Sequence, residues 1–159
     1  MDERIRRARP AEAEALTALA WRAKAHWGYD AAFMELVSPA MALSDIDVAV
    51  DECWVLEDPA GLIGGFHRVI LGNPCELEDL WVEPSAIGIG HGRRLFEHAV
   101  GVARSAGASV LELDADPNAV GFYERMGMER IGETPSTLIP GRTLPRMRMS
   151  LSEPASASP

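Results

Sequence analysis

The sequence predicts one mixed α/β or α+β domain in which helices cover the faces of a central sheet. Short strands are grouped early, and the order strand, helix, strand, helix, strand, strand follows. No linker or internal repeat divides the 159 residues, which are enough to bury most of the apolar surface. We expect one domain over residues 1–151. The Pro-, Ser- and Ala-rich segment 152–159 is expected to be disordered.

The first third of the chain is predicted to be a short strand followed by helices. Residues 4–8 form the strand, and Pro10 suits the first turn of the helix that follows. Gly28 ends this helix, and Asp30 is a good N-cap for the next one. The segment 44–50 is consistent with either a short capped helix or a strand.

The rest of the chain is predicted from apolar spacing and from turn residues. In chain order the elements are a hairpin over 53–70 with its turn at 57–61, a strand within 75–84, a helix from 90 to 106, a strand over 109–116, a compact helix over 116–127, and two strands at 129–133 and 144–151. Gly107 and Gly127 are expected to end the two helices.

Composition excludes several classes of function. A formal net charge of −9 argues against nucleic-acid binding, which normally needs a basic face. No apolar run approaches the roughly 18 residues of a membrane span, and the N-terminus lacks a signal-peptide core. Cys53 and Cys75 have no metal-site or CxxC spacing, so we read them as reduced thiols. We therefore expect a cytoplasmic protein with no metal and with neither nucleic acid nor membrane as partner.

Three alternating glycines precede the helix predicted from residue 90. The third glycine of a dinucleotide-binding fingerprint would fall at Arg93, and a P-loop would need Lys where Arg93 follows Gly92. Gly88, Gly90 and Gly92 instead predict backbone amides that converge at a helix N-terminus beside Arg93 and Arg94. Such a site suits phosphate, because unpaired N–H groups and the helix dipole attract anions.

Two other interpretations of the glycines stay open. They can form a tight turn with no ligand. The second is a site for a nicotinamide cofactor, because Glu112 and Asp114 follow the glycines at about the sequence spacing of a ribose-binding acid.

Two motifs together resemble the GCN5-related N-acetyltransferase (GNAT) superfamily. In that family a hydrophobic strand ending near a proline leads into Arg/Gln-x-x-Gly-x-Gly/Ala, which here is residues 87–92. A later helix carries Asn-x-x-Ala-x-x-x-Tyr, which here runs from Asp116 to Tyr123. The resemblance covers residues 3–151. It implies a mostly antiparallel sheet of about six to seven strands with helices on both faces, and acetyl-CoA as the cofactor.

The resemblance also implies where acetyl-CoA binds. The amides of residues 88–92 would hold the pyrophosphate, Arg93 or Arg94 the outer phosphates, and the backbone of residues 80–82 the pantetheine. The full expected set is Leu80, Trp81, Val82, Ile87, Gly88, Ile89, Gly90, His91, Gly92, Arg93, Arg94, Asp116, Asn118, Phe122 and Tyr123.

Two residues depart from the family pattern. Ile87 replaces the usual Arg or Gln, so only the backbone is expected to contact CoA at this position. Asp116 replaces Asn, and its carboxylate is expected to repel CoA, although Asn118 is close enough to substitute. These departures keep open an alternative function, a catalytically inactive sensor that binds CoA or acyl-CoA.

Tyr123 falls where the family places its general acid, and a phenol with a pKa of about 10 can protonate a departing thiolate. Glu78 is the first candidate for the base. Glu76 and Glu78 are expected on one face of their strand and Asp79 on the other. Strand ends are usually polar, so Glu112 and Asp114 of the next strand stay as alternatives.

Acceptor recognition in the family involves two loops. The first contains His26, Trp27 and Tyr29, which suit a cation, and the second contains Arg142, which can bind a carboxylate. The predicted function is acetyl transfer to the primary amine of a small molecule or a peptide by direct attack. Exposed edge strands near the C-terminus suggest a homodimer.

Overall fold

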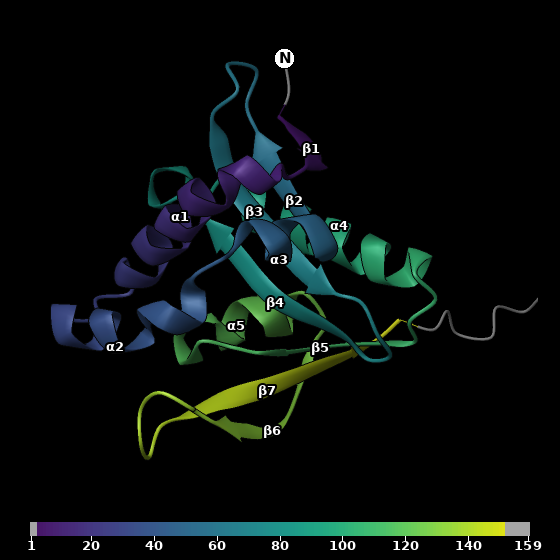
Figure 1. Ribbon diagram of the computed structural model, residues 1–159. Coiled ribbons are helices and arrows are strands. Elements are labelled where there is room, and N and C mark those ends of the chain that lie inside the picture. The colour runs from purple at the N-terminus through teal and green to yellow at the C-terminus, as the bar shows by residue number, and fades with distance from the viewer. Residues whose placement is uncertain (1–2, 152–159) are drawn as a thin grey trace, which may run out of the picture.

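A computed structural model describes residues 3–151 as a twisted sheet flanked by helices (Figure 1). The strands are β1 (Arg4–Arg7), β2 (Glu52–Glu57), β3 (Ile63–Ile70), β4 (Cys75–Val82), β5 (Val110–Asp114), β6 (Glu129–Pro135) and β7 (Thr143–Ser150). The α-helices are α1 (Ala13–Ala25), α2 (Ala31–Met41), α3 (Asp45–Val50), α4 (His91–Ser105) and α5 (Val120–Arg125). Short 3₁₀ turns are η1 (Pro10–Glu12), η2 (Pro84–Ala86) and η3 (Pro117–Ala119). The predicted tail 152–159 lies outside the described residues.

The sheet has seven strands in the order β1-β2-β3-β4-β5-β7-β6. Only β4 and β5 pair in parallel among these described strands, and all the other neighbours are antiparallel. The predicted fold class, a mostly antiparallel sheet of six to seven strands with helices on both faces, is therefore confirmed.

The segment that the sequence left ambiguous forms the helix α3. Ser44 caps it, because its hydroxyl accepts a hydrogen bond from the Asp47 backbone N–H at 3.0 Å. The Asp47 carboxylate accepts one in return from the Ser44 backbone N–H at 2.9 Å, which completes a capping box. This reciprocal cap satisfies two otherwise free donors, so the strand alternative for residues 46–50 was wrong.

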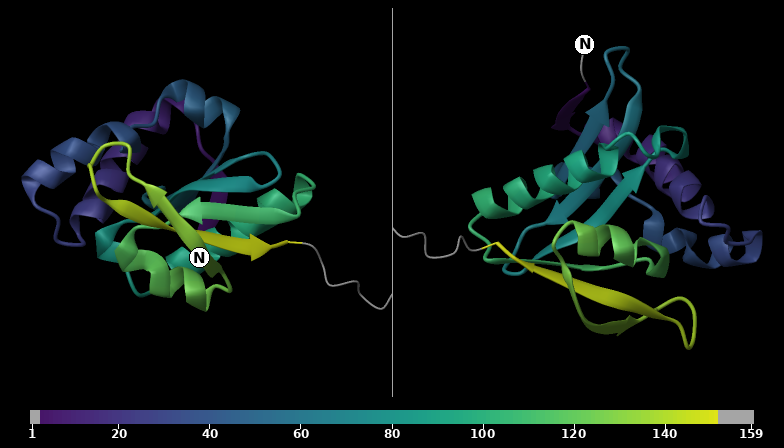
Figure 2. Two further views of the ribbon diagram at one scale, coloured as in Figure 1. Left: turned by 90° about the horizontal axis from the view of Figure 1, so that it is seen from below. Right: turned by 180° about the vertical axis from the view of Figure 1, so that it is seen from behind.

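Two apolar cores lie on opposite faces of the sheet. Figure 1 shows α1 and α3 on the near side of the sheet. The view from behind in Figure 2 shows α4 and α5 on the opposite side. One core joins α4 and α5 to β4, β5 and β7, and includes Phe96, Leu111 and Met147. The other joins α1, α2 and α3 to β2 and β3 around Leu16 and Phe66. Among the described residues, no helix has the length and apolarity needed to cross a membrane.

Candidate active site

A cleft opens where β4 and β5 separate. The two strands pair only at Cys75–Leu111 and Glu76–Glu112. Beyond these pairs, the β5-facing edge of residues 77–82 has no strand partner in the described part of the chain. The resulting cavity has a volume of about 560 Å³. Because a strand edge carries unpaired N–H and C=O groups, an extended ligand can pair with it.

A β-bulge places Glu78 in this cleft. Leu77 lies opposite Val69 and Asp79 lies opposite Arg68, so Glu78 is the extra residue of β4. Strict alternation would put Glu76 and Glu78 on one face. The bulge breaks that alternation at Asp79: Glu76 lies opposite Ile70 and Asp79 opposite Arg68, so Glu76 and Asp79 share a face. Glu78 lines the cleft, and Glu76 pairs with Arg146 at 2.6 Å.

Burial raises the pKa of Glu78, and the nearby charge of Asp79 raises it further. A carboxylate with a raised pKa is the better proton acceptor. Asp79 itself lies buried, where it pairs with Arg68 at 2.7 Å and accepts from Trp81 Nε1 at 3.1 Å. Of these two neighbouring acids, Glu78 is thus the one open to a ligand.

The glycine-rich turn leads into a helix start with free backbone N–H groups. Gly88 and Gly90 both adopt φ +89°, a left-handed conformation that residues with a side chain rarely adopt. Gly90 is the N-cap of α4 and offers no side-chain cap, and the first intrahelical bond runs from the Arg94 N–H to the Gly90 carbonyl. The N–H groups of residues 91–93 are therefore the free donors of the helix start.

Gly92 brings α4 close to α5. A Cβ atom at this position would lie 3.2 Å from the Phe122 ring, which is tighter than nearly all real contacts. The helix start and Phe122 can therefore line the same cleft.

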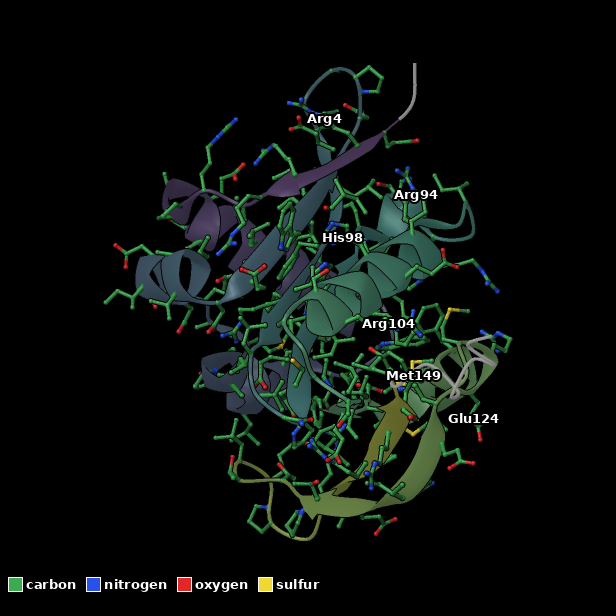
Figure 3. The ribbon with its side chains drawn as sticks, turned by 90° about the vertical axis from the view of Figure 1, so that its right-hand side faces the viewer. Arg4, Arg94, His98, Arg104, Glu124 and Met149 are labelled. Atoms are coloured by element: carbon green, nitrogen blue, oxygen red, sulfur yellow. The ribbon has the colours of Figure 1, made fainter. Side chains whose placement is uncertain are left out.

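The two arginines that follow the glycines have different positions. Arg93 lines the cleft. Arg94 instead bonds to the Glu3 carbonyl at 3.1 Å and lies 3.6 Å from its carboxylate. Figure 3 shows Arg94 near the β1 end of α4, away from Arg104 at the other end. His91 is buried and reaches the same Glu3 at 3.5 Å. Glu3, which the sequence analysis missed because it is distant in the chain, thus ties β1 to the loop.

Tyr123 is buried on α5 and lines the cleft. Its ring packs against Phe122 at 5.2 Å and Phe96 at 6.1 Å between centroids. Burial raises the pKa of the phenol, and the charges of Asp79 and Asp116 raise it further. The hydroxyl therefore stays protonated at neutral pH, as a general acid requires.

Asp116 is enclosed by partners from three other segments. Its carboxylate accepts from Lys24 Nζ at 2.6 Å, from the Tyr29 hydroxyl at 3.0 Å and from Asn118 Nδ2 at 2.9 Å. Arg142 donates to the Tyr29 hydroxyl at 3.1 Å and lies 4.0 Å from Asp116. We call these five residues the Asp116 network.

The network neutralises the charge that the sequence analysis expected to repel CoA. Burial alone would raise the pKa of Asp116, but the Lys24 hydrogen bond and the Asn118 backbone N–H hold it below its usual range. The expected free carboxylate is thus absent, because Lys24 from the last turn of α1 pairs with it. Sequence reasoning missed Lys24, whose only signal is its position between Ala23 and Ala25 on a helix face.

The structure brings most of the predicted site residues together. Those that line the cleft are His26, Trp27, Glu78, Leu80, Trp81, Val82, Ile87, Gly88, Gly90, His91, Gly92, Arg93, Asp116, Phe122 and Tyr123. Those outside its lining are Tyr29, Ile89, Arg94, Asn118 and Arg142. Asp114 lines the cleft as well, while Glu112 pairs with Arg146 at 2.9 Å.

Comparison with known proteins identifies the family. Residues 49–130 match the family model described as an acetyltransferase (GNAT) domain. YjaB of Salmonella typhimurium, a peptidyl-lysine N-acetyltransferase, is 32% identical over 139 residues, which cover 82% of this chain and 86% of that protein. The chain belongs to the GNAT family. This GNAT protein is therefore an acetyltransferase that takes its acetyl group from acetyl-CoA, and the nicotinamide alternative was wrong.

Solved GNAT structures share its fold. A GCN5-related N-acetyltransferase from Rhodopseudomonas palustris superposes with a TM-score of 0.77 at 21% identity, over 94% of this chain and 96% of that one. The PaiA N-acetyltransferase of Thermoplasma acidophilum, solved with coenzyme A, gives a TM-score of 0.75 at 18% identity, over 94% and 99%. At these identities the likeness concerns the fold alone.

Proposed function

We propose that this GNAT acetyltransferase acetylates the ε-amine of a lysine in a peptide or protein. The observation that carries the proposal is the cleft between β4 and β5. It is lined by the helix start of residues 90–93 and by Tyr123, and also by the carboxylates of Glu78 and Asp114. A cationic lysine is attracted by acidic walls. The name of the Salmonella relative supports the same acceptor class.

The cleft residues fit acetyl-CoA. We assign the pyrophosphate to the free N–H groups of residues 91–93 and the side chain of Arg93, and the pantetheine to the unpaired edge of residues 80–82. Ile87 and Phe122 add apolar surface. Because Arg94 is engaged by Glu3, we leave it out of this assignment.

Two side chains move protons in the proposed reaction. Glu78 accepts the proton that the lysine ammonium must lose before its nitrogen attacks the thioester carbon. The new C–N bond replaces the C–S bond, and the sulfur leaves with the electron pair. The Tyr123 hydroxyl donates a proton to that sulfur. The nitrogen, which is positively charged after its attack, loses its second proton to the Tyr123 phenolate, and free thiol and N-acetyl-lysine are the products.

We make two further proposals, one on the cellular compartment and one on the oligomeric state. We place the protein in the cytoplasm because Cys53 and Cys75 are both free and buried, which suits a reducing compartment. We also propose a homodimer formed through β6, an edge strand whose residues are mostly exposed. Sedimentation equilibrium would test it, and a monomer at micromolar concentration would contradict it.

A peptide assay tests the acceptor class. The substrate is a peptide with a blocked N-terminus and a single lysine, and the matched control carries arginine instead. We expect free thiol to appear with the lysine peptide alone, together with the mass increase of one acetyl group. Transfer to free polyamines but not to the peptide would overturn the lysine assignment. Binding of acetyl-CoA without transfer to any amine would favour the inactive sensor.

A further inference from the structure

We propose that Asp116 is a positioning residue that sets the acceptor side of the cleft by fixing the turn that carries His26 and Trp27. The proposal rests on the proposed acetyl transfer, and it assigns to Asp116 a role other than binding the cofactor.

Both ends of the turn are bound to one carboxylate. Lys24, two residues before His26, donates to Asp116 Oδ2 at 2.6 Å. Tyr29, two residues after Trp27, donates to the same atom at 3.0 Å. The intervening His26 and Trp27 line the cleft. A displacement of Asp116 must therefore move the cleft wall that these residues form.

The Lys24–Asp116 ion pair is buried, so each of its charges depends on the other. The side chains of Lys24 and Asp116 are 9% and 7% exposed. Removing one partner of such a pair leaves an uncompensated charge away from water, whereas removing both can be nearly neutral. Neutralising Asp116 alone should thus drive Lys24 toward solvent and open the turn.

The loop between β6 and β7 joins the same Asp116 network through Arg142. Arg142, in the loop between β6 and β7, stacks over the Phe33 ring at 4.7 Å and over the Tyr29 ring at 5.6 Å. Tyr29 and Phe33 stack on each other at 4.1 Å between centroids. The end of α1, the start of α2 and the β6–β7 loop therefore form one wall, and Asp116 connects that wall to the end of β5.

Asp116→Asn is the sharpest test, because asparagine keeps the shape and retains an oxygen for the Asn118 backbone N–H. We expect the KM for the lysine peptide to rise about tenfold, which corresponds to about 1.4 kcal/mol, while the acetyl-CoA Kd changes less than about twofold. Hydrogen exchange at residues 26–28 should accelerate, because their amides bond to Arg22, Lys24 and Ala25 within this turn. The double variant Lys24→Met/Asp116→Asn should recover slow exchange and most of the KM.

Glu57→Gln is the matched control. Glu57 of β2 is similarly buried, with a side chain that is 10% exposed. It pairs with Arg4 and Arg6 of β1 and lies outside the cleft lining. It should lower stability without changing the peptide KM or exchange at residues 26–28.

Three results would overturn the proposal. A weaker acetyl-CoA Kd in Asp116→Asn, with an unchanged peptide KM, would make Asp116 a cofactor ligand. Unchanged exchange at residues 26–28 would show that it does not hold the turn. An equal KM rise in Glu57→Gln would reveal a general loss of stability. If the wild-type protein acetylates no peptide, the proposed acceptor fails, but the exchange experiment still decides the role of Asp116.

Discussion

Glu76 of β4 and Glu112 of β5 lie opposite each other and form the last pair before the two strands diverge. Like charges directly opposite on a sheet repel. Arg146 of β7 offsets this repulsion, because it donates to Glu76 at 2.6 Å and to Glu112 at 2.9 Å. One guanidinium thus fastens β4 to β5 at the base of the cleft.

Replacing this guanidinium should weaken the fold. In Arg146→Met two carboxylates would face each other without the cation that bonds both, and we expect a loss of about 2 kcal/mol in the free energy of unfolding, measured with urea. Arg148→Met is the control, because Arg148 is 51% exposed and lies 3.8 Å from Glu112. It should cost less than about 0.5 kcal/mol. Equal losses in the two variants would contradict the role of Arg146.

Tyr123→Phe should slow the chemical step and spare binding. Removing a general acid typically costs about 10²-fold or more in kcat. The ring that packs on Phe96 and Phe122 is retained, so the acetyl-CoA Kd should change less than about twofold. Stopped-flow thiol release and calorimetric titration measure the two quantities. A variant with full kcat would remove Tyr123 from the mechanism.

The acid limb of the pH profile should report Glu78. Its pKa is raised above the usual 4.5 by burial and by Asp79, so the active carboxylate is lost as the pH falls through that raised value. We expect kcat/KM for the lysine peptide to decline on the acid side with an apparent pKa above 4.5. Glu78→Gln should lower kcat/KM by about 10²-fold and abolish this limb. Persistence of the limb in the variant would assign the base elsewhere.

Only glycine should fit the left-handed backbone at position 90, before α4. At φ +89°, Gly90→Ala carries a strain of about 1–2 kcal/mol, and we expect it to weaken acetyl-CoA binding about tenfold. Gly101→Ala in the middle of α4 is the matched control, since a Cβ there meets nothing within 4 Å. It should stabilise the protein by about 0.5–1 kcal/mol and leave affinity unchanged. An unchanged Kd in Gly90→Ala would separate the turn from the cofactor.

A buried histidine should make the fold sensitive to acid. His67 of β3 lies 2.9 Å from His98 of α4, and burial, aided by His98, lowers the pKa of His67 to about 3. The unfolded chain takes up a proton below its usual value of 6.5, whereas the folded chain does not. Stability therefore falls as the pH drops from 6.5 toward 3, by up to about 1.4 kcal/mol per unit from this group. Urea unfolding of His67→Gln should show a flatter dependence, and an identical slope would contradict this.

The fold and most of the residues that line the cleft could be predicted from the sequence. Gly88, Gly90 and Tyr123 belong to local motifs, and local motifs need only their own backbone geometry to be recognised. The capping box that settles α3 was equally visible in Ser44 and Asp47. In that segment the cap residues were present, although residues 44–50 were also consistent with a strand.

Contacts between distant segments could not be predicted in this way. Nothing in the order Arg93-Arg94 tells which arginine faces the cleft, because the answer depends on Glu3, which lies 91 residues from Arg94. The alternation of β4 predicted Glu76 and Asp79 on opposite faces, and the bulge opposite Arg68 and Val69 brought them onto one face.

The sequence by itself determined the order of elements, the glycine turn and the place of Tyr123 on α5, because each depends on residues within one or two helical turns. Only the tertiary structure decided which partners surround Asp116. Alone it is a carboxylate in place of an amide. In the fold it is held by Lys24, 92 residues away in the chain, and the energy of a buried charge depends on the partner that packing supplies.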